Sequence, residues 1–230
     1  VPKSGLYQLS LSVLQNTSRG KFSTRELRIN GLVPFKEAFA IKFDYNTSFE
    51  MVTVGNGKEP YLIYLEEGIN TIELQVTLGP LGPIVQEVQE SVTILNDLYR
   101  QIMQITGPVP EPYIDYELEK KLPHMQPTFE KEYQRLKRIV NDLQTIAGDK
   151  SDQTALIDQM AVQLGSLSKK PREVIRQLNM MQSNISAMST WILQANEQPL
   201  EIDFFVLSQP NAKLPRVKAN LFERLYFSIF

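Results

Sequence analysis

Residues 198–206 read QPLEIDFFV. After Gln198-Pro199, apolar side chains recur at every second position, which is the period of a β-strand: Leu200, Ile202, Phe204 and Val206. A single strand does not remain folded without hydrogen-bonded neighbours, so this one needs partners elsewhere in the chain. The residues directly before it have a helical period, so the partners must lie further upstream.

The first 80 residues supply these partners, because their apolar pattern indicates several short strands. A half-buried strand is predicted where Tyr7, Leu9, Leu11 and Val13 alternate with Gln8, Ser10 and Ser12. Further candidates lie at 27–29, 49–54, 60–65 and 69–78, and Asn30-Gly31 is a strong signal for a tight turn. Short strands at this spacing predict a sandwich or a barrel.

The middle of the chain, residues 81–197, has the period of α-helices. Apolar residues recur there in steps of three and four within 88–102, 129–147, 157–167 and 174–192. The first set is Val88, Val92, Leu95, Tyr99 and Ile102, and the last set ends at Ile192. Such spacing places each set on one side of its helix, and four such helices can bury one another in a bundle. The proline-rich sequence GPVPEP at 107–112 ends the first helix.

These patterns together predict an α+β multidomain fold, in which an antiparallel β-sandwich is interrupted by an α-helical bundle insertion. We expect the discontinuous sandwich to comprise 1–80 and 198–210, and the bundle to comprise 81–197. The chain should enter and leave the bundle at neighbouring points of the sandwich. Residues 211–230 are expected to form a C-terminal tail with a short amphipathic helix.

Composition excludes several classes of function. The 230 residues include 24 basic and 26 acidic side chains, and a net charge of -2 gives no electrostatic basis for nucleic-acid binding. Cysteine is absent and His124 is the single histidine, which excludes disulfides, thiol chemistry and cysteine-histidine zinc sites. No apolar run reaches the ~20 residues of a membrane helix. The chain starts at Val1 without an initiator Met, so we expect an excised or processed piece.

Several segments resemble known families. The segments at 5–7, 15–16, 25–31, 34–38, 60–65 and 68–71 resemble a galactose-binding-like jelly roll, and 200–205 resembles its closing strand. The order of jelly roll, helical insertion, NISAMSTW at 184–191 and EQPL at 197–200 is more specific. It resembles the N-terminal region, upstream of the solute-binding domain, of large extracellular solute-binding proteins of Gram-positive sugar ABC importers.

This resemblance implies a non-catalytic, extracellular module of a carbohydrate importer, associated with the cell surface as part of a lipoprotein. Its partners would be an oligosaccharide or polysaccharide, the remainder of the solute-binding protein, and the transporter. The resemblance transfers no binding residue, because no functional motif is established for this region. The alternative is a structural adaptor that makes protein-protein contacts through the helical bundle.

The residues themselves suggest a glycan site in the sandwich. Sugar sites combine an aromatic face with a few fixed polar groups. Two loop segments, 16–21 and 43–49, contain Asn16, Arg19, Tyr45, Asn46 and Phe49, which could form a cleft at one end of the sandwich. The competing interpretation is that the aromatic residues of 43–49 point into the core.

Catalytic and metal sites are not expected. His124 lies at a helix start, where an exposed or capping role is expected, and it lacks an evident carboxylate partner. Glu66-Glu67 flank a turn, and neighbouring strand residues point to opposite faces, so they do not form a glycosidase pair. Asp44, Asn46 and Glu50 could donate oxygen ligands to a structural calcium ion, but their spacing is not that of a calcium loop. We therefore predict no cofactor.

Overall fold

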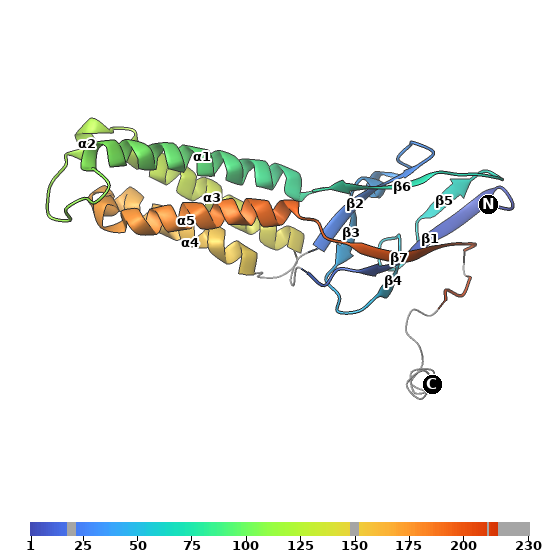
Figure 1. Cartoon of the computed structure of the whole chain (residues 1–230). Helices are drawn as coiled ribbons and strands as arrows, with labels where there is room; N and C mark the ends of the chain where they lie inside the picture. Colours follow the sequence, from blue (N-terminus) through green and yellow to red (C-terminus); the bar gives the residue numbers. More distant parts are fainter. Residues whose placement is uncertain (18–21, 148–151, 211, 216–230) are drawn as a thin grey trace, which may run out of the picture. The chain divides into compact units, whose positions relative to one another are not determined.

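The computed structural model describes residues 1–17, 22–147, 152–210 and 212–215. The chain divides into two units, one formed by Val1–Gly79 with Gln198–Phe230 and the other by Pro80–Glu197 (Figure 1). The first unit contains the strands and the second the long helices, which confirms the predicted α+β fold with a helical insertion. Of residues 211–230, where a short helix was expected, only 212–215 are described, and they form neither helix nor strand.

The first unit consists of two antiparallel sheets. In one sheet, β1 (Gly5–Leu14) pairs along one edge with β5 (Leu62–Leu65) and β4 (Glu50–Thr53), and along the other with β7 (Glu201–Ser208). In the other, β2 (Phe22–Ile29) lies between β3 (Ile41–Asp44) and β6 (Ile72–Thr77). The short 3-10 helix η1 (Lys36–Ala40) precedes β3. The strand predicted from QPLEIDFFV is therefore β7, and its partner is the first strand of the chain.

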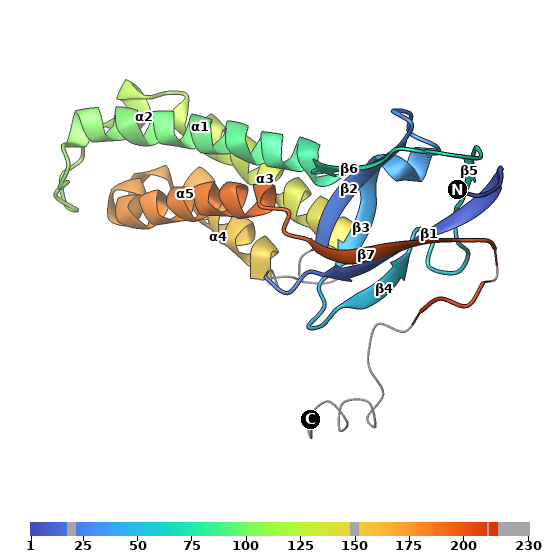
Figure 2. The same ribbon diagram turned by 45° about the vertical axis from the view of Figure 1, so that its right-hand side comes forward.

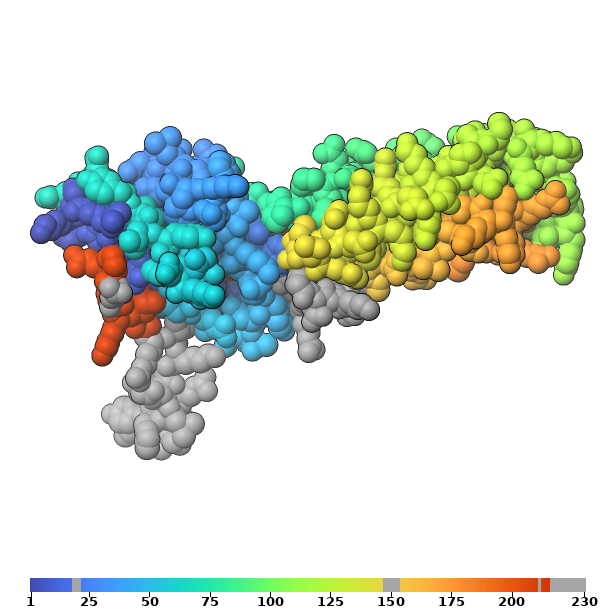
Figure 3. Space-filling view, turned by 180° about the vertical axis from the view of Figure 1, so that it is seen from behind, coloured from blue at the N-terminus to red at the C-terminus, as the bar shows by residue number. Residues whose placement is uncertain are grey.

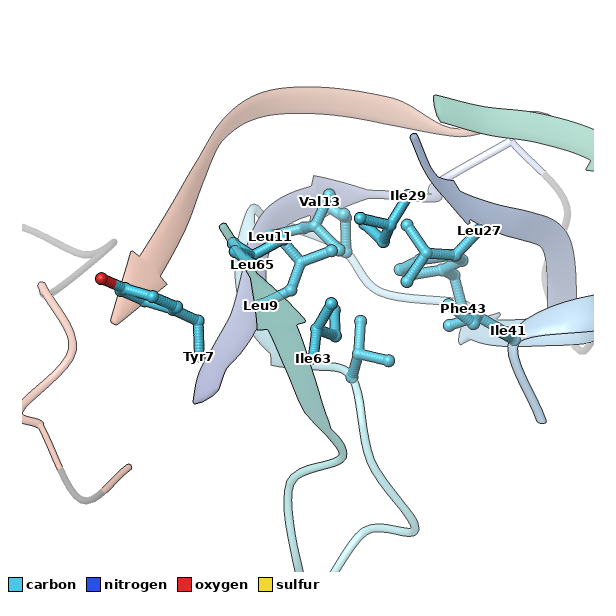
Figure 4. Close-up of a cluster of buried hydrophobic side chains, with 12 residues drawn as sticks. Tyr7, Leu9, Leu11, Val13, Leu27, Ile29, Ile41, Phe43, Ile63 and Leu65 are labelled. Atoms are coloured by element: carbon cyan, nitrogen blue, oxygen red, sulfur yellow. The ribbon is translucent and has the colours of Figure 1, made fainter. Parts of the chain in front are cut away.

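The two sheets pack face to face around one apolar core. Both sheets contribute fully or almost fully buried side chains, which meet between them (Figure 4): Leu9, Leu11, Val13, Ile63 and Leu65 from one, and Leu27, Ile29, Ile41 and Phe43 from the other. The turn predicted at Asn30-Gly31 is also present, since both residues have positive φ and Ile29 pairs with Leu32 across them.

Strand β1 is buried on both faces, although its alternating sequence predicts a half-buried strand. Gln8, Ser10 and Ser12 are buried as well as the apolar residues between them. The reason is that β1 has neighbours along both edges, and their side chains cover its small polar residues. Gln8 Nε2 donates to Ser208 Oγ at 2.9 Å, and the Ser10 and Thr53 hydroxyls are 2.8 Å apart.

Strand β2 fixes the point where the chain returns to the sandwich. The Thr24 N–H donates to Gln198 Oε1 at 2.7 Å, and Arg25 Nη2 donates to the Gln198 carbonyl at 2.8 Å. Ser23 Oγ donates to the next carbonyl, that of Pro199. Burial lowers the pKa of the Arg25 guanidinium from its ordinary value. These bonds attach the two residues that shortly precede β7 to β2.

The second unit is a four-helix bundle. Its long helices are α1 (Leu81–Thr106), α3 (Met125–Ala147), α4 (Asp152–Lys169) and α5 (Val174–Asn196). Contacts join α1 to α3, α3 to α4, α4 to α5 and α5 to α1, so the helices form a closed ring (Figure 2). The short α2 (Leu118–Lys121) and the 3-10 helix η2 (Pro171–Glu173) belong to the connections. Among the described residues, no helix is both long and apolar enough to span a membrane.

The buried side of α1 differs by one position from the predicted one. Ser91 and Leu98 are buried, whereas Val92 and Tyr99 are only half-buried. A polar residue can occupy the core position because the Ser91 hydroxyl donates to Glu132 Oε2 of α3 at 2.6 Å. In α5, likewise, Trp191 is buried and the predicted Ile192 is half-buried.

Candidate functional site

The structure places the start of one predicted glycan-binding segment, at Asn16, next to the other segment at the end of β1. The Asn46 N–H donates to the Gln15 carbonyl at 3.0 Å, and the Gln15 N–H donates to Asn46 Oδ1 at 2.9 Å. These bonds place the 45–49 segment beside Asn16, which is exposed. Tyr45 and Phe49 are half-buried. Arg19, the remaining candidate, lies outside the described residues.

Asn46 has a different role from the other candidates because its side chain is engaged within the sandwich. The residue is buried, its Oδ1 accepts from Gln15 and its Nδ2 donates to the Val13 carbonyl at 3.2 Å. Both ends of the amide are therefore used to hold the loop against β1. Asn46 therefore positions the loop.

Replacing Asn46 by alanine should lower the free energy of unfolding of the sandwich by about 2 kcal/mol, because two buried backbone groups lose their side-chain partner. The measurement is urea denaturation followed by circular dichroism. Asn16→Ala is the matched control, since this nearby asparagine is exposed and its removal should change stability by less than about 0.5 kcal/mol. Equal effects of the two substitutions would contradict the assigned roles.

The aromatic residues of the 43–49 segment do not share one environment. Phe43 is fully buried in the core, as the competing interpretation expected, whereas Tyr45 and Phe49 retain partial exposure. Part of each of these two rings is thus accessible to a ligand.

The oxygen donors considered for calcium are spread over different interactions. Asp44 Oδ1 is 3.0 Å from Lys42 Nζ, the Asn46 amide is engaged as described above, and Glu50 is exposed at the start of β4. Within the described ranges, no group of three or more His, Cys, Asp or Glu residues could hold a metal ion.

The residues considered for catalysis lie on the surface. His124 is exposed, and its Nε2 is 3.0 Å from Gln101 Oε1. Glu66 and Glu67 are both exposed in the turn before Gly68, where their backbones bond with Asn70 and Ser4. The two carboxylates flank a turn, as the sequence indicated.

One buried charged cluster was not predicted from the sequence. Glu132 of α3 has no solvent exposure, and its Oε2 is 3.6 Å from Arg135 Nη1. The same Arg135 nitrogen is 3.7 Å from Glu90 Oε2 of α1. Glu132 follows Phe129 by three positions, but the predicted buried side continued through Tyr133, so the sequence did not indicate that Glu132 is buried. Because Glu132 is inaccessible, it acts as a polar link between α1 and α3, together with Ser91.

The bundle contains a cavity of about 420 Å³ at the end formed by the α1–α3 and α4–α5 connections. Figure 3 shows the lime-coloured residues of the first connection beside the orange start of α5. We call this feature the tip cavity; its walls are residues 112–120, Met125, 171–173, Ile175 and Arg176. From the sequence, the prolines at 107–112 indicated only the end of a helix. The two tyrosines that follow them, Tyr113 and Tyr116, were the residues that could have indicated a binding site in this connection.

Comparison with known proteins identifies the helical unit. Residues 83–194 match the family model described as bacterial solute-binding protein, 4-helix bundle domain. The searches of curated proteins and of solved structures gave no match.

The helical unit thus matches the four-helix bundle domain of bacterial solute-binding proteins. This assignment confirms the resemblance to solute-binding proteins that the sequence indicated. Proteins of this class bind a ligand and work with a transporter, and they are usually extracellular or surface-associated. Domains of the family are generally non-catalytic.

Proposed function

We propose that this chain is a non-catalytic extracellular module of the solute-binding protein of a carbohydrate ABC importer, anchored as a lipoprotein on a Gram-positive cell. Its sandwich, a galactose-binding-like jelly roll, would bind an oligosaccharide or polysaccharide. The observation that carries the proposal is the insertion of a solute-binding-protein bundle domain into a β-sandwich with accessible aromatic and polar side chains at one loop end.

The residues of the proposed glycan site have different roles. Tyr45 and Phe49 offer partly exposed aromatic surface for the apolar face of a sugar ring. Exposed Asn16 can both donate and accept hydrogen bonds with sugar hydroxyls, and Arg19 adds a donor. Asn46 holds the 45–49 segment against the end of β1.

Substituting Tyr45 by alanine is expected to weaken glycan binding at least tenfold, because the aromatic surface is lost. The measurement is calorimetric titration of the full chain with a glycan that the wild-type chain binds. Tyr64→Ala serves as the matched control, since Tyr64 is an exposed tyrosine of β5 away from this loop end. Undiminished affinity of a folded Tyr45→Ala variant would overturn the assignment of this site.

A second candidate function is the structural adaptor, which would contact another protein through the bundle. It is favoured by three apolar side chains, Val109, Tyr113 and Ile114, which are exposed within six positions of the α1–α3 connection. Specific capture of a protein partner by the wild-type chain, together with an absence of glycan binding, would favour this second function.

A further inference from the structure

The tip cavity lies entirely within the helical unit, separate from the loops that carry the proposed glycan site. Its volume of about 420 Å³ falls in the range of small-ligand sites. One wall is the 112–120 segment, which includes α2, and the other is formed by η2 and the first turn of α5.

The aromatic groups at the cavity are available to a ligand. Tyr113 is 91% exposed although it lines the cavity. Tyr116 is half-buried, and its hydroxyl accepts a hydrogen bond from the Glu111 N–H at 2.9 Å. That bond fixes the position of the hydroxyl and leaves its proton able to donate.

The opposite wall presents two guanidinium groups with unused donors. Arg172 and Arg176 are separated by four positions, and both line the cavity. Arg172 Nε is 3.8 Å from Glu119 Oε2, which is an ion pair without hydrogen-bond geometry. Arg176 is exposed and forms no ion pair with any described residue.

Carboxylates at the cavity are held in place by local partners and keep accepting capacity. Glu117 Oε1 is 2.6 Å from Lys120 Nζ, and Asp115 Oδ1 accepts from the Glu117 N–H at 2.9 Å. Glu117 itself has a φ of 54°, an unfavourable conformation for a residue with a side chain. Each carboxylate has two oxygens, so both can still accept hydrogen bonds from a ligand.

The balance of these groups indicates the chemical class of the ligand. The cavity is lined by four carboxylates and three cations, which nearly cancel, so neither an anion nor a cation is favoured by net charge. A neutral molecule rich in hydroxyls fits better, because hydroxyls donate to carboxylates and accept from guanidinium groups. Its C–H faces can pack on the tyrosine rings. We infer that the tip cavity binds a neutral oligosaccharide.

A polypeptide is a poorer match to the same walls. The cores of protein-protein interfaces are depleted in Lys, Glu and Asp, and these types supply five of the cavity-lining residues. The most exposed apolar side chain of the connection, apart from Tyr113, is Val109, and it does not line the cavity. The inference adds a second carbohydrate site to the proposed function and does not depend on the site at the end of β1.

The test is a nuclear magnetic resonance titration of the ¹⁵N-labelled full chain with maltohexaose, cellohexaose, xylohexaose and mannohexaose in turn. At least one of them should give saturable shifts of amide signals from 113–120 and 172–176. Tyr113→Ala and Arg176→Ala should each weaken this binding at least tenfold. Lys131→Ala, which removes an exposed cation of α3 outside the cavity, should leave it unchanged. Tyr45→Ala should also leave it unchanged, which separates this site from the sandwich site.

Two results would overturn the inference. One is the absence of saturable shifts at these amides with all four oligosaccharides. If a parallel titration with hexaglutamate then shifts the same amides, the partner of the cavity is a polypeptide. The other is binding that persists undiminished in folded Tyr113→Ala and Arg176→Ala variants.

Discussion

Trp191→Ala is expected to lower the free energy of unfolding of the bundle by about 3–5 kcal/mol. Trp191 is the single tryptophan, only 1% of its surface is exposed, and it lies on the buried side of α5. Truncation removes a large apolar side chain and leaves a cavity that closely packed helices fill only in part. Thermal unfolding followed at 222 nm, where helices dominate the signal, measures the loss.

Two further variants test whether the loss of stability comes from the burial of the Trp191 ring or from any truncation at this end of α5. Trp191→Phe should cost much less, because it keeps a ring and removes an indole N–H that is buried without a hydrogen-bond partner among the described residues. Leu193→Ala, on the same helix but 70% exposed, should change stability by less than about 0.5 kcal/mol. If Leu193→Ala destabilised the bundle as much as Trp191→Ala, the assigned packing of α5 would be wrong.

The sandwich should be equally sensitive at Phe43, where alanine is expected to cost about 3–5 kcal/mol. Phe43 of β3 is fully buried between the sheets and directly precedes the segment that carries Tyr45 and Asn46. We therefore expect glycan binding to weaken along with stability. Hydrogen exchange of the strand amides measures the first effect, and calorimetric titration of the folded fraction the second.

Phe39→Ala is the matched control for Phe43→Ala. It removes the same side chain from η1, where the residue is 55% exposed, so stability should change by less than about 1 kcal/mol. A larger effect at Phe39 than at Phe43 would contradict the observed core of the sandwich.

The periodicity of the sequence was sufficient to predict the architecture. The period-two pattern at 200–206 and in the first 80 residues identified strands of one sandwich, and the steps of three and four identified the four long helices. These patterns are informative because each element buries one side against its neighbours. The need of a late strand for neighbours predicted that β7 pairs within the first 80 residues, and the structure shows that its partner there is β1.

Polar residues in buried positions could not be predicted in the same way. Ser91 and Glu132 occupy core positions of the bundle because they bond to each other, and Asn46 is buried because it bonds to the backbone of β1. A periodicity argument treats such residues as exposed, since the compensating partner is distant in sequence. The sequence likewise did not indicate that the Asn46 side chain bonds to Gln15 and Val13.

The tip cavity was missed for a related reason. Its walls come from the α1–α3 connection with the start of α3, and from η2 with the start of α5, which are far apart in sequence, and neither region carries a recognisable motif. Only the folding of the bundle places Tyr113 and Arg176 at the same cavity. A cavity built in this way depends on the helices that position its walls.

The most direct test of the proposed carbohydrate module is a glycan-array screen of the purified full chain, with each hit confirmed by calorimetry and the glycan analysed afterwards by mass spectrometry. We predict saturable binding to one class of glycan, which is recovered intact. An absence of binding across a broad array, or recovery of cleaved glycan, would contradict the account of this chain as a non-catalytic carbohydrate-recognition module.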